Sequence, residues 1–294
     1  MYVPSAIDWF LRKAAAYARR KKPLPTTPEI EDHVFLFLGG LHRSGTSILH
    51  RLLREHPSAS GFTGTAVYED EGQHLQTVFP PAKVYGGPGR FAFDPRSHLT
   101  ETSDLITASN KEHLLREWGA YYNLERRVLL EKSPPNLVRS RFFQALFPGS
   151  RFVFIVRHPI VVSLATQKWS GNSVVELILH WYVANRILFD DFKRLQHSLI
   201  FRYEDFVQAP QSYLDAICNL VGIDSFKPQE SVANFNGKYL LAWFPRYERE
   251  RELLIHLYPE VVAFLSQLGY TLTEPYVTNL ADKRFLADTR SAKQ

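Results

Sequence analysis

The sequence is poor in cysteine, with Cys218 as the single thiol among 294 residues. A disulfide within the chain is therefore impossible, and no Cys/His spacing typical of a zinc site is present. No apolar run approaches the ~20 residues of a membrane-spanning helix, and the N-terminus lacks the apolar segment of a signal peptide. We therefore expect a soluble, cytoplasmic protein without a metal site.

A strong excess of one charge sign is also missing. Lys and Arg number 35 against 30 Asp and Glu, and the basic residues are scattered along the chain. This distribution argues against a nucleic-acid binder, which concentrates its cations on one face. It suits a pocket for a small polyanion. The chain is 45% hydrophobic, with 21 Phe and 14 Tyr, which is enough for a large core and argues against global disorder.

Residues 5–22 have the periodicity of an amphipathic helix with basic residues on its polar side. Three prolines between residues 23 and 28 end that pattern. We therefore predict residues 1–28 as an N-terminal helix with a proline-rich linker, followed by one main domain over residues 29–294. The favoured interpretation packs the helix on the domain. The alternative is peripheral contact with an anionic membrane.

Buried strands and helices alternate through the rest of the chain. Four apolar segments predict strands, at Val34–Leu38, Val128–Glu131, Arg151–Val156 and Leu199–Arg202. Helices are predicted at residues 46–56, 100–118, 136–147, 174–196 and 210–221. This order predicts a single α/β domain with a central, mostly parallel sheet covered by helices on both faces. Residues 57–99 form a long Gly/Pro-rich segment, which is typical of a functional loop.

The first strand leads into a glycine loop, Gly40–Ser47, with the G-x-x-x-x-G frame of a nucleotide-binding loop. Backbone N–H groups there, with the positive end of the next helix, can surround an anion. The usual lysine is replaced by Thr46, so a kinase would lack its main charge clamp. The cation is Arg43 instead, which suits a ligand whose reacting group lies just beyond one 5′-phosphate. Taken alone, the loop could also be a tight strand-to-helix turn.

A second candidate anion site follows the strand at residues 151–156. Arg157 comes directly after this strand, where residues of an α/β sheet line the ligand crevice. By itself it could equally be a surface arginine beside Pro159. Together with the glycine loop, it points to a nucleotide that has phosphates at both ends of its ribose.

On these segments the chain resembles the sulfotransferases that use 3′-phosphoadenosine-5′-phosphosulfate (PAPS). The glycine loop is similar to the family's 5′-phosphosulfate loop, Val156–Pro159 to its 3′-phosphate segment, and Phe201–Phe206 to its third recurring segment. The resemblance runs from Phe35 to Phe206 and implies a P-loop-like sulfotransferase fold. It also implies the donor contacts: Arg43, Ser44, Gly45, Thr46 and Ser47 on the 5′-phosphosulfate, Arg157 on the 3′-phosphate, and Tyr203 near the adenine.

The chain departs from the family pattern in two places. Ala165 stands where the family usually has a serine that binds the 3′-phosphate, and hydroxyls lie nearby at Ser163 and Thr166. We favour Ser163 for this contact, with Thr166 as the alternative. The family's C-terminal phosphate segment is also not visible, and residues 236–239 are a candidate to cover the nucleotide in its place.

Sulfuryl transfer needs a base for the acceptor and a cation near the leaving oxygen. The segment around Glu71 resembles the acidic segment of carbohydrate and protein-tyrosine sulfotransferases, which implies Glu71 as the base, with His74 second. A solvated acidic loop is the alternative interpretation. Lys132, in a segment similar to the Glu-Lys-Ser/Thr-Pro of carbohydrate sulfotransferases, is the expected catalytic cation, assisted by Arg43. Glu131 is expected either to hold Lys132 or to form an ion pair at the strand end.

The sequence therefore predicts transfer of a sulfuryl group from PAPS, with PAP as product, to a hydroxyl or amine of a small-molecule or carbohydrate acceptor. The resemblance leans toward a saccharide or glycolipid, and Tyr85, Phe91 and Phe93 are candidates to stack on it. The alternatives are a P-loop nucleotide kinase and a non-catalytic nucleotide binder of the same fold. The sequence specifies neither the acceptor nor the oligomeric state.

Overall fold

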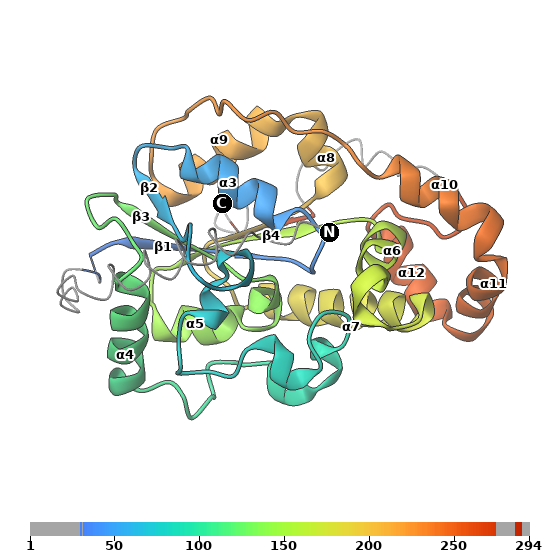
Figure 1. Cartoon of the computed structure of the whole chain (residues 1–294), viewed down its shortest axis with the longest axis horizontal. Coiled ribbons are helices and arrows are strands. Elements are labelled where there is room, and N and C mark those ends of the chain that lie inside the picture. Colours follow the sequence, from blue (N-terminus) through green and yellow to red (C-terminus); the bar gives the residue numbers. More distant parts are fainter. Residues whose placement is uncertain (1–29, 31, 275–285, 290–294) are drawn as a thin grey trace, which may run out of the picture.

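The computed structural model describes residue 30, residues 32–274 and residues 286–289. Its centre is a six-stranded sheet with the strand order β2-β3-β1-β4-β5-β6 (Figure 1). The strands are β1 Val34–Gly39, β2 Ala59–Gly61, β3 Val128–Lys132, β4 Arg151–Val156, β5 Ser198–Arg202 and β6 Ala287–Asp288. The pairs among β1 to β5 are parallel, and β6 joins β5 in the antiparallel sense. The prediction of a mostly parallel sheet is confirmed.

Both faces of this sheet are buried. Successive residues of a strand pack alternately into two separate apolar cores, one on each face. Phe35 and Phe37 of β1 belong to one core, whereas Leu36 and Leu38 belong to the other. This alternation follows from the two-residue period of a strand. Strands that are covered on both sides have near-continuous apolar runs, and the middle of each of the strands β1, β3, β4 and β5 has this pattern.

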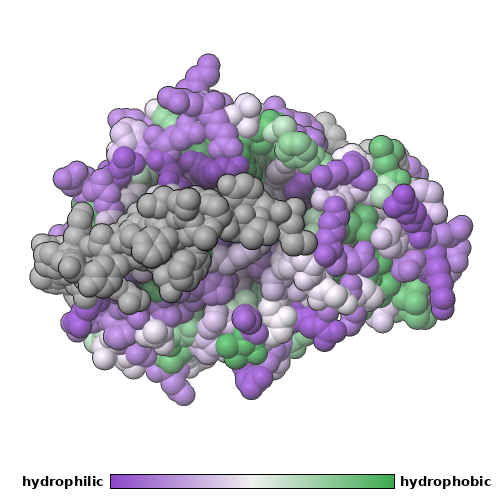
Figure 2. Space-filling model, in the orientation of Figure 1, coloured by the Kyte–Doolittle hydropathy of each residue, from purple (hydrophilic) through white to green (hydrophobic). Residues whose placement is uncertain are grey.

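Helices cover the two faces and extend the domain at one end (Figure 1). One face carries α3 Thr46–Arg54, α8 Tyr203–Gln208 and α9 Pro210–Val221. The other face carries α4 Ala108–Gly119, α5 Ser140–Leu146 and α7 Val174–Phe192. Near one end of the sheet lie α6 Pro159–Ser170, α10 Gly237–Arg246, α11 Glu248–Leu257 and α12 Pro259–Gln267. The face shown in Figure 2 is mostly hydrophilic, with small separate apolar patches.

Three predicted segments differ from the structure in detail. The helix expected at 100–118 begins at Ala108, because the Thr107 hydroxyl caps it by accepting a hydrogen bond from Asn110 N at 3.1 Å. The helix expected at 136–147 is divided at Arg139, whose φ of −131° separates a 3₁₀ helix at Pro134–Val138 from α5. The long loop contains β2, a strand of three residues that is too short for a periodic pattern.

That loop, residues 57–99, also contains five short 3₁₀ helices. These are Tyr68–Asp70, Gly72–His74, Ala82–Tyr85, Phe91–Phe93 and Pro95–Ser97. The loop is therefore compact, and several of its side chains are buried, including Phe62, Glu71 and Phe91.

The sheet order creates a topological switch point at β1. After β1 the chain builds β2 and β3 on one side, and it then builds β4 and β5 on the other. The segments that follow β1, β3 and β4 therefore meet at one edge, which is where ligands of open α/β sheets bind. The predicted N-terminal helix and the boundary at residue 28 lie outside the described residues. Within the described part of the chain, no helix is long and apolar enough to cross a membrane.

Candidate active site

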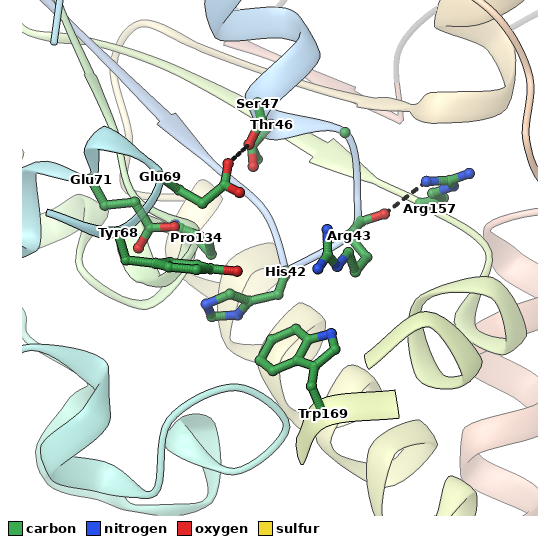
Figure 3. A pocket seen from close by; sticks show the side chains of 11 residues that line it. His42, Arg43, Thr46, Ser47, Tyr68, Glu69, Glu71, Pro134, Arg157 and Trp169 are labelled. Carbon is green, nitrogen blue, oxygen red and sulfur yellow. Dashed lines mark hydrogen bonds between the residues drawn. The ribbon is translucent and has the colours of Figure 1, made fainter. Parts of the chain in front are cut away.

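A cavity of about 190 Å³ lies at the carboxyl edge of the sheet (Figure 3). It brings together the glycine loop, the acidic segment and the end of β4. Its lining residues are His42, Arg43, Gly45, Thr46, Ser47, Tyr68, Glu69, Glu71, Pro134, Arg157 and Trp169. Predicted donor contacts and the predicted base thus share one cavity, although they come from distant parts of the chain.

The glycine loop has a conformation that depends on Gly45. This residue precedes α3 with φ of 108°, a left-handed conformation that side chains other than glycine rarely adopt. A Cβ atom at this position would also lie 2.7 Å from Cδ2 of Tyr203. Arg43 is left-handed as well, with φ of 69°. The loop therefore packs tightly on the sheet and passes directly into the N-terminus of α3, where the helix dipole favours an anion.

Arg157 is fixed against this loop by three contacts. Its Nη1 donates a hydrogen bond to the carbonyl oxygen of Arg43 at 2.9 Å (Figure 3), and its Nε donates to Oδ1 of Asn236 at 2.8 Å. Its guanidinium carbon lies 3.9 Å from the centre of the Tyr203 ring. Burial lowers the pKa of Arg157 from its ordinary value, and the nearby Tyr203 opposes this effect. All three contacts are to uncharged groups, so they orient the cation without neutralising it.

A buried carboxylate anchors the partners of Arg157. Glu204 Oε1 accepts hydrogen bonds from Asn236 Nδ2 at 2.6 Å and from the backbone N–H of His158 at 3.1 Å. Its Oε2 accepts from the Tyr270 hydroxyl at 2.8 Å. The glycine loop, the segment from Tyr203 to Glu204, Asn236 and Tyr270 therefore all help to hold the guanidinium of Arg157 in place. Tyr270 lies far from every motif, so no pattern in the sequence selects it.

Tyr203 lies beneath the donor region. Its ring touches the glycine loop and the guanidinium of Arg157, and its hydroxyl donates to the carbonyl oxygen of Ala233 at 2.8 Å. The side chain is buried. Its evident structural role is to support Arg157 and Gly45, and its contact with adenine stays a prediction.

The acidic segment places Glu71 beside Lys132. Glu71 is 3% exposed, and its Oε1 lies 3.6 Å from the Lys132 ammonium. Its Oε2 accepts a hydrogen bond from Gln73 at 2.6 Å and lies 3.8 Å from Nε2 of His74. Burial raises the pKa of Glu71, whereas the positive charge of Lys132 lowers it. The two candidate bases are therefore neighbours, and Glu71 is the one that lines the cavity.

Lys132 lies behind this carboxylate, outside the residues that line the cavity. Its Nζ donates to the carbonyl oxygen of Glu69 at 2.8 Å, and the side chain is buried. Glu131 does not hold Lys132, because no ion pair or hydrogen bond joins the two within the described residues. The Glu131 carboxylate instead accepts hydrogen bonds from Ser133 Oγ at 2.6 Å and from Asn136 Nδ2. Burial raises the pKa of Glu131 to about 7.

Backbone strain accompanies the acidic segment. Glu69 and Asp70 have φ of 53° and 51°, which is the left-handed region and is costly for residues with a Cβ atom. Asp70 stabilises the turn, because its carboxylate accepts hydrogen bonds from the backbone N–H of Thr65 at 2.7 Å and of Gly64 at 3.1 Å. The turn leaves Glu69 exposed in the cavity, where Ser47 Oγ donates to its Oε2 at 3.3 Å.

Two lining residues were missed by the sequence interpretation, namely His42 and Trp169. The ring of Trp169 lies 5.4 Å from the guanidinium carbon of Arg43, and its centre is 6.0 Å from that of His42. His42 occupies a variable position of the glycine-loop motif, so the motif gives no reason to select it. Trp169 lies near the end of α6 and reaches the cavity only through the packing of that helix.

A model of the sulfotransferase family matches residues 36–228, which is more than half of the chain. The matched range contains the glycine loop, the acidic segment, Lys132, Arg157 and Tyr203. The chain belongs to the sulfotransferase family. The prediction made from the recurring motifs is therefore confirmed at the level of the family.

Individual relatives are distant. Protein-tyrosine sulfotransferase 2 of Gallus gallus is 25% identical over 199 residues, which are 64% of this chain and 51% of that protein. The chain thus spans about half the length of this curated relative. A sulfotransferase structure from Alicyclobacillus acidocaldarius has a TM-score of 0.48 at 19% identity and covers 79% of this chain and 94% of its own. Sulfotransferase STF9 of Mycobacterium avium has a TM-score of 0.48 at 12% identity, with 91% and 83% covered.

The hydroxyl candidates of this sulfotransferase lie apart from the cavity that Arg157 lines. Ser163 and Thr166 are on one side of α6, as expected for residues three apart on a helix, and both are buried. They line a second, smaller cavity together with His42. The contact of Ser163 with a 3′-phosphate therefore stays a prediction, and the side chain that accepts a hydrogen bond from Arg157 is that of Asn236.

Proposed function

We propose that this sulfotransferase transfers a sulfuryl group from PAPS to a hydroxyl or amine of its acceptor. The observation that carries the proposal is the pairing of two cations on one cavity. Arg43 lies in a lysine-free glycine loop, and Arg157 is hydrogen-bonded to the carbonyl oxygen of that same residue. This arrangement suits a nucleotide with a phosphosulfate at its 5′ position and a phosphate at its 3′ position.

The proposed reaction is an in-line displacement at sulfur. The acceptor oxygen forms the new S–O bond while the bond from sulfur to the 5′-phosphate oxygen breaks, and the acceptor proton passes to Glu71. The negative charge that develops on the leaving oxygen is stabilised by Arg43 and by the N-terminal end of α3. PAP leaves with the bonding electrons of the broken bond.

In this scheme Lys132 acts through Glu71. Its ammonium lies 3.6 Å from the carboxylate and is itself buried, so it favours the ionised form of Glu71 and opposes burial, which raises the pKa of this carboxyl. This role differs from direct contact with the leaving oxygen, which the resemblance implied. The difference can be tested, because the two roles predict different pH dependence when Lys132 is replaced.

For the acceptor we propose a saccharide or the sugar of a glycolipid. Tyr68 and Trp169 line the cavity and are 60% and 41% exposed, so their rings are accessible to a sugar or to another flat ring. The cavity also contains Glu69, an exposed carboxylate that can accept hydrogen bonds from hydroxyls. The Gallus gallus relative is named for protein tyrosine, so a tyrosine peptide is the comparison substrate.

Calorimetric titration of the purified protein with PAP, compared with ATP plus magnesium, tests the donor. We expect PAP to bind tightly without metal and ATP to bind weakly. A preference for ATP with magnesium would favour the kinase alternative. If neither nucleotide binds, both enzyme hypotheses fail.

Transfer of labelled sulfate from PAPS then tests the acceptor. Oligosaccharides, glycolipids and tyrosine peptides are offered at matched concentration, and label is expected in the saccharide arms. Label confined to the peptide would replace the proposed acceptor. PAP binding without transfer to any of these acceptors would favour the non-catalytic alternative.

A further inference from the structure

A second, much smaller cavity lies between the glycine loop and α6. It offers room of about 10 Å³, and its lining includes His42, Ser163, Thr166 and His180. His42 also lines the main cavity and therefore borders both spaces. The smaller cavity has the size that one water molecule requires.

Three polar side-chain atoms of residues that line this cavity lack partners within the described residues. Nδ1 of His42, Oγ of Ser163 and Oγ1 of Thr166 are all buried and make no hydrogen bond. Buried polar groups in native proteins are nearly always paired, because an unpaired one loses its hydration without compensation. The rest of the lining is largely apolar, with Leu41, Val162 and Leu177, so these three atoms are the candidate partners of a single water, which needs two to four polar partners.

The imidazole of His42 is neutral in this setting. Burial lowers its pKa to about 3, and the positive charges of Lys132 and Arg43, with His180 and His74, act in the same direction. On its other side the ring meets the main cavity, near Tyr68 and Trp169 (Figure 3). The acceptors available there are the carboxylates of Glu69 and Glu71 and, by the proposed function, the sulfuryl oxygens. A neutral imidazole serves these acceptors only if the proton is on Nε2.

We propose that one internal water, bound by Ser163 and Thr166, donates a hydrogen bond to Nδ1 of His42 and keeps the His42 proton on Nε2. From there the Nε2–H group donates a hydrogen bond to the sulfuryl group during transfer, a step that rests on the proposed function. His42 is then a catalytic donor that never changes its charge, and Ser163 and Thr166 are positioning residues. This assigns the two buried hydroxyls a role other than binding the 3′-phosphate.

The tautomer is measured directly by long-range ¹H–¹⁵N correlation spectra of the labelled full chain near neutral pH. We expect His42 with an unprotonated Nδ1 and a protonated Nε2. The Ser163→Ala/Thr166→Val double variant is expected to show a mixture of both tautomers. Ser150→Ala removes another buried hydroxyl without a hydrogen-bond partner among the described residues, outside this cavity, and should leave the His42 signals unchanged.

A protonated Nδ1 in the unaltered protein would overturn the proposal. So would an unchanged His42 tautomer in a double variant whose remaining spectrum shows a folded chain. A crystal structure of the unaltered protein gives a second check, since an ordered water within hydrogen-bond distance of all three atoms is expected. A water-free cavity would contradict the inference.

Kinetics test the catalytic half of the proposal. His42→Phe keeps a planar ring without a donor and is expected to lower kcat about tenfold, the size of one neutral hydrogen bond, with PAP affinity changed less than about twofold. His42→Gln returns an N–H donor near the position of Nε2 and should recover most of the activity. Equal kcat for the Phe variant and the unaltered enzyme would remove His42 from the reaction. If PAP does not bind at all, the proposed function fails, whereas the spectra still decide the water and the tautomer.

Discussion

The main cavity has a donor wall, formed by the glycine loop and Arg157, and an acidic wall, formed by Glu69 and Glu71 with Lys132 behind them. The cations of the two walls have opposite kinds of partner. On the donor wall, Arg157 contacts an amide, a carbonyl oxygen and an aromatic ring, and within the described residues it has no ion-pair partner. On the acidic wall, the charge of Lys132 is met by Glu71 at 3.6 Å. The first cation is oriented but not neutralised, so it is available to an anionic ligand. The ammonium of Lys132 is paired with Glu71 inside the protein, and its charge lowers the pKa of that carboxyl.

This difference suggests that the donor wall binds the nucleotide, whereas the acidic wall takes part in the reaction. A preorganised cation with neutral supports favours an arriving phosphate without any rearrangement of the protein. Burial raises the pKa of the Glu71 carboxyl and the neighbouring ammonium of Lys132 lowers it, and opposing effects of this kind adjust the pKa of a base. Substitutions on the donor wall should therefore change nucleotide affinity, whereas substitutions on the acidic wall should change turnover and its pH dependence.

Replacement of the proposed base should have the largest effect. Glu71→Gln is expected to lower kcat by about 10²- to 10⁴-fold, because it removes the proton acceptor, and to leave PAP affinity nearly unchanged. Glu69→Gln is the matched comparison, since this residue lines the same cavity but is exposed. A larger loss for the Glu69 variant would exchange the two roles. Loss of both affinity and turnover in Glu71→Gln would indicate a structural role.

Lys132→Met should have the next largest effect on kcat/KM, and it tests whether the ammonium lowers the pKa of Glu71. Without the ammonium the pKa of Glu71 rises further, so the acidic limb of the kcat/KM profile should move to higher pH. We expect a loss of about tenfold to a hundredfold at pH 7 that partly recovers at pH 9. The exposed Lys83→Met serves as the control. A loss that is the same at every pH would instead favour direct contact of Lys132 with the leaving oxygen.

On the donor wall, Arg157→Ala should weaken PAP binding about 10- to 100-fold, the range for a charge-assisted contact. Adenosine 5′-monophosphate, which lacks the 3′-phosphate, should lose far less. The control is Arg151→Ala, at the opposite end of the same strand, where the side chain donates to the carbonyl oxygen of Leu220 at 3.0 Å. Calorimetry with both nucleotides provides the comparison, and equal weakening of the two would refute the assignment.

The last expected effect is on stability rather than on binding or turnover. Burial raises the pKa of Glu131 to about 7 in the folded chain, from an ordinary 4.5. The folded state therefore binds this proton more tightly than the unfolded state, so the contribution of Glu131 is greatest below pH 4.5 and declines as pH rises toward 7. Urea unfolding at several pH values should show a decline of up to about 3 kcal/mol that is absent in Glu131→Gln. The exposed Glu125→Gln should keep it, and an equal slope in the Glu131 variant would contradict the raised pKa.

Much of the donor wall follows from short-range features of the sequence. The apolar segments at β1, β3, β4 and β5 specify strands that are buried on both faces, and the missing loop lysine argues against a kinase. Arg43 and Arg157 could be selected because each lies in the segment that directly follows a strand. Parallel strands bring such segments to one edge of a sheet regardless of the details of packing.

The contacts within the acidic wall and the groups that support Arg157 on the donor wall depend on the tertiary structure. The family resemblance implied Glu71 as the base, but the sequence does not show which of the carboxylates of Glu69, Asp70 and Glu71 is buried against Lys132 and which one closes the turn. Likewise, the cavity that joins His42 to Ser163 and Thr166 exists only because α6 packs against the glycine loop. Strand periodicity and loop chemistry are local properties of the chain, whereas desolvation and charge pairing depend on contacts between segments that are far apart in sequence.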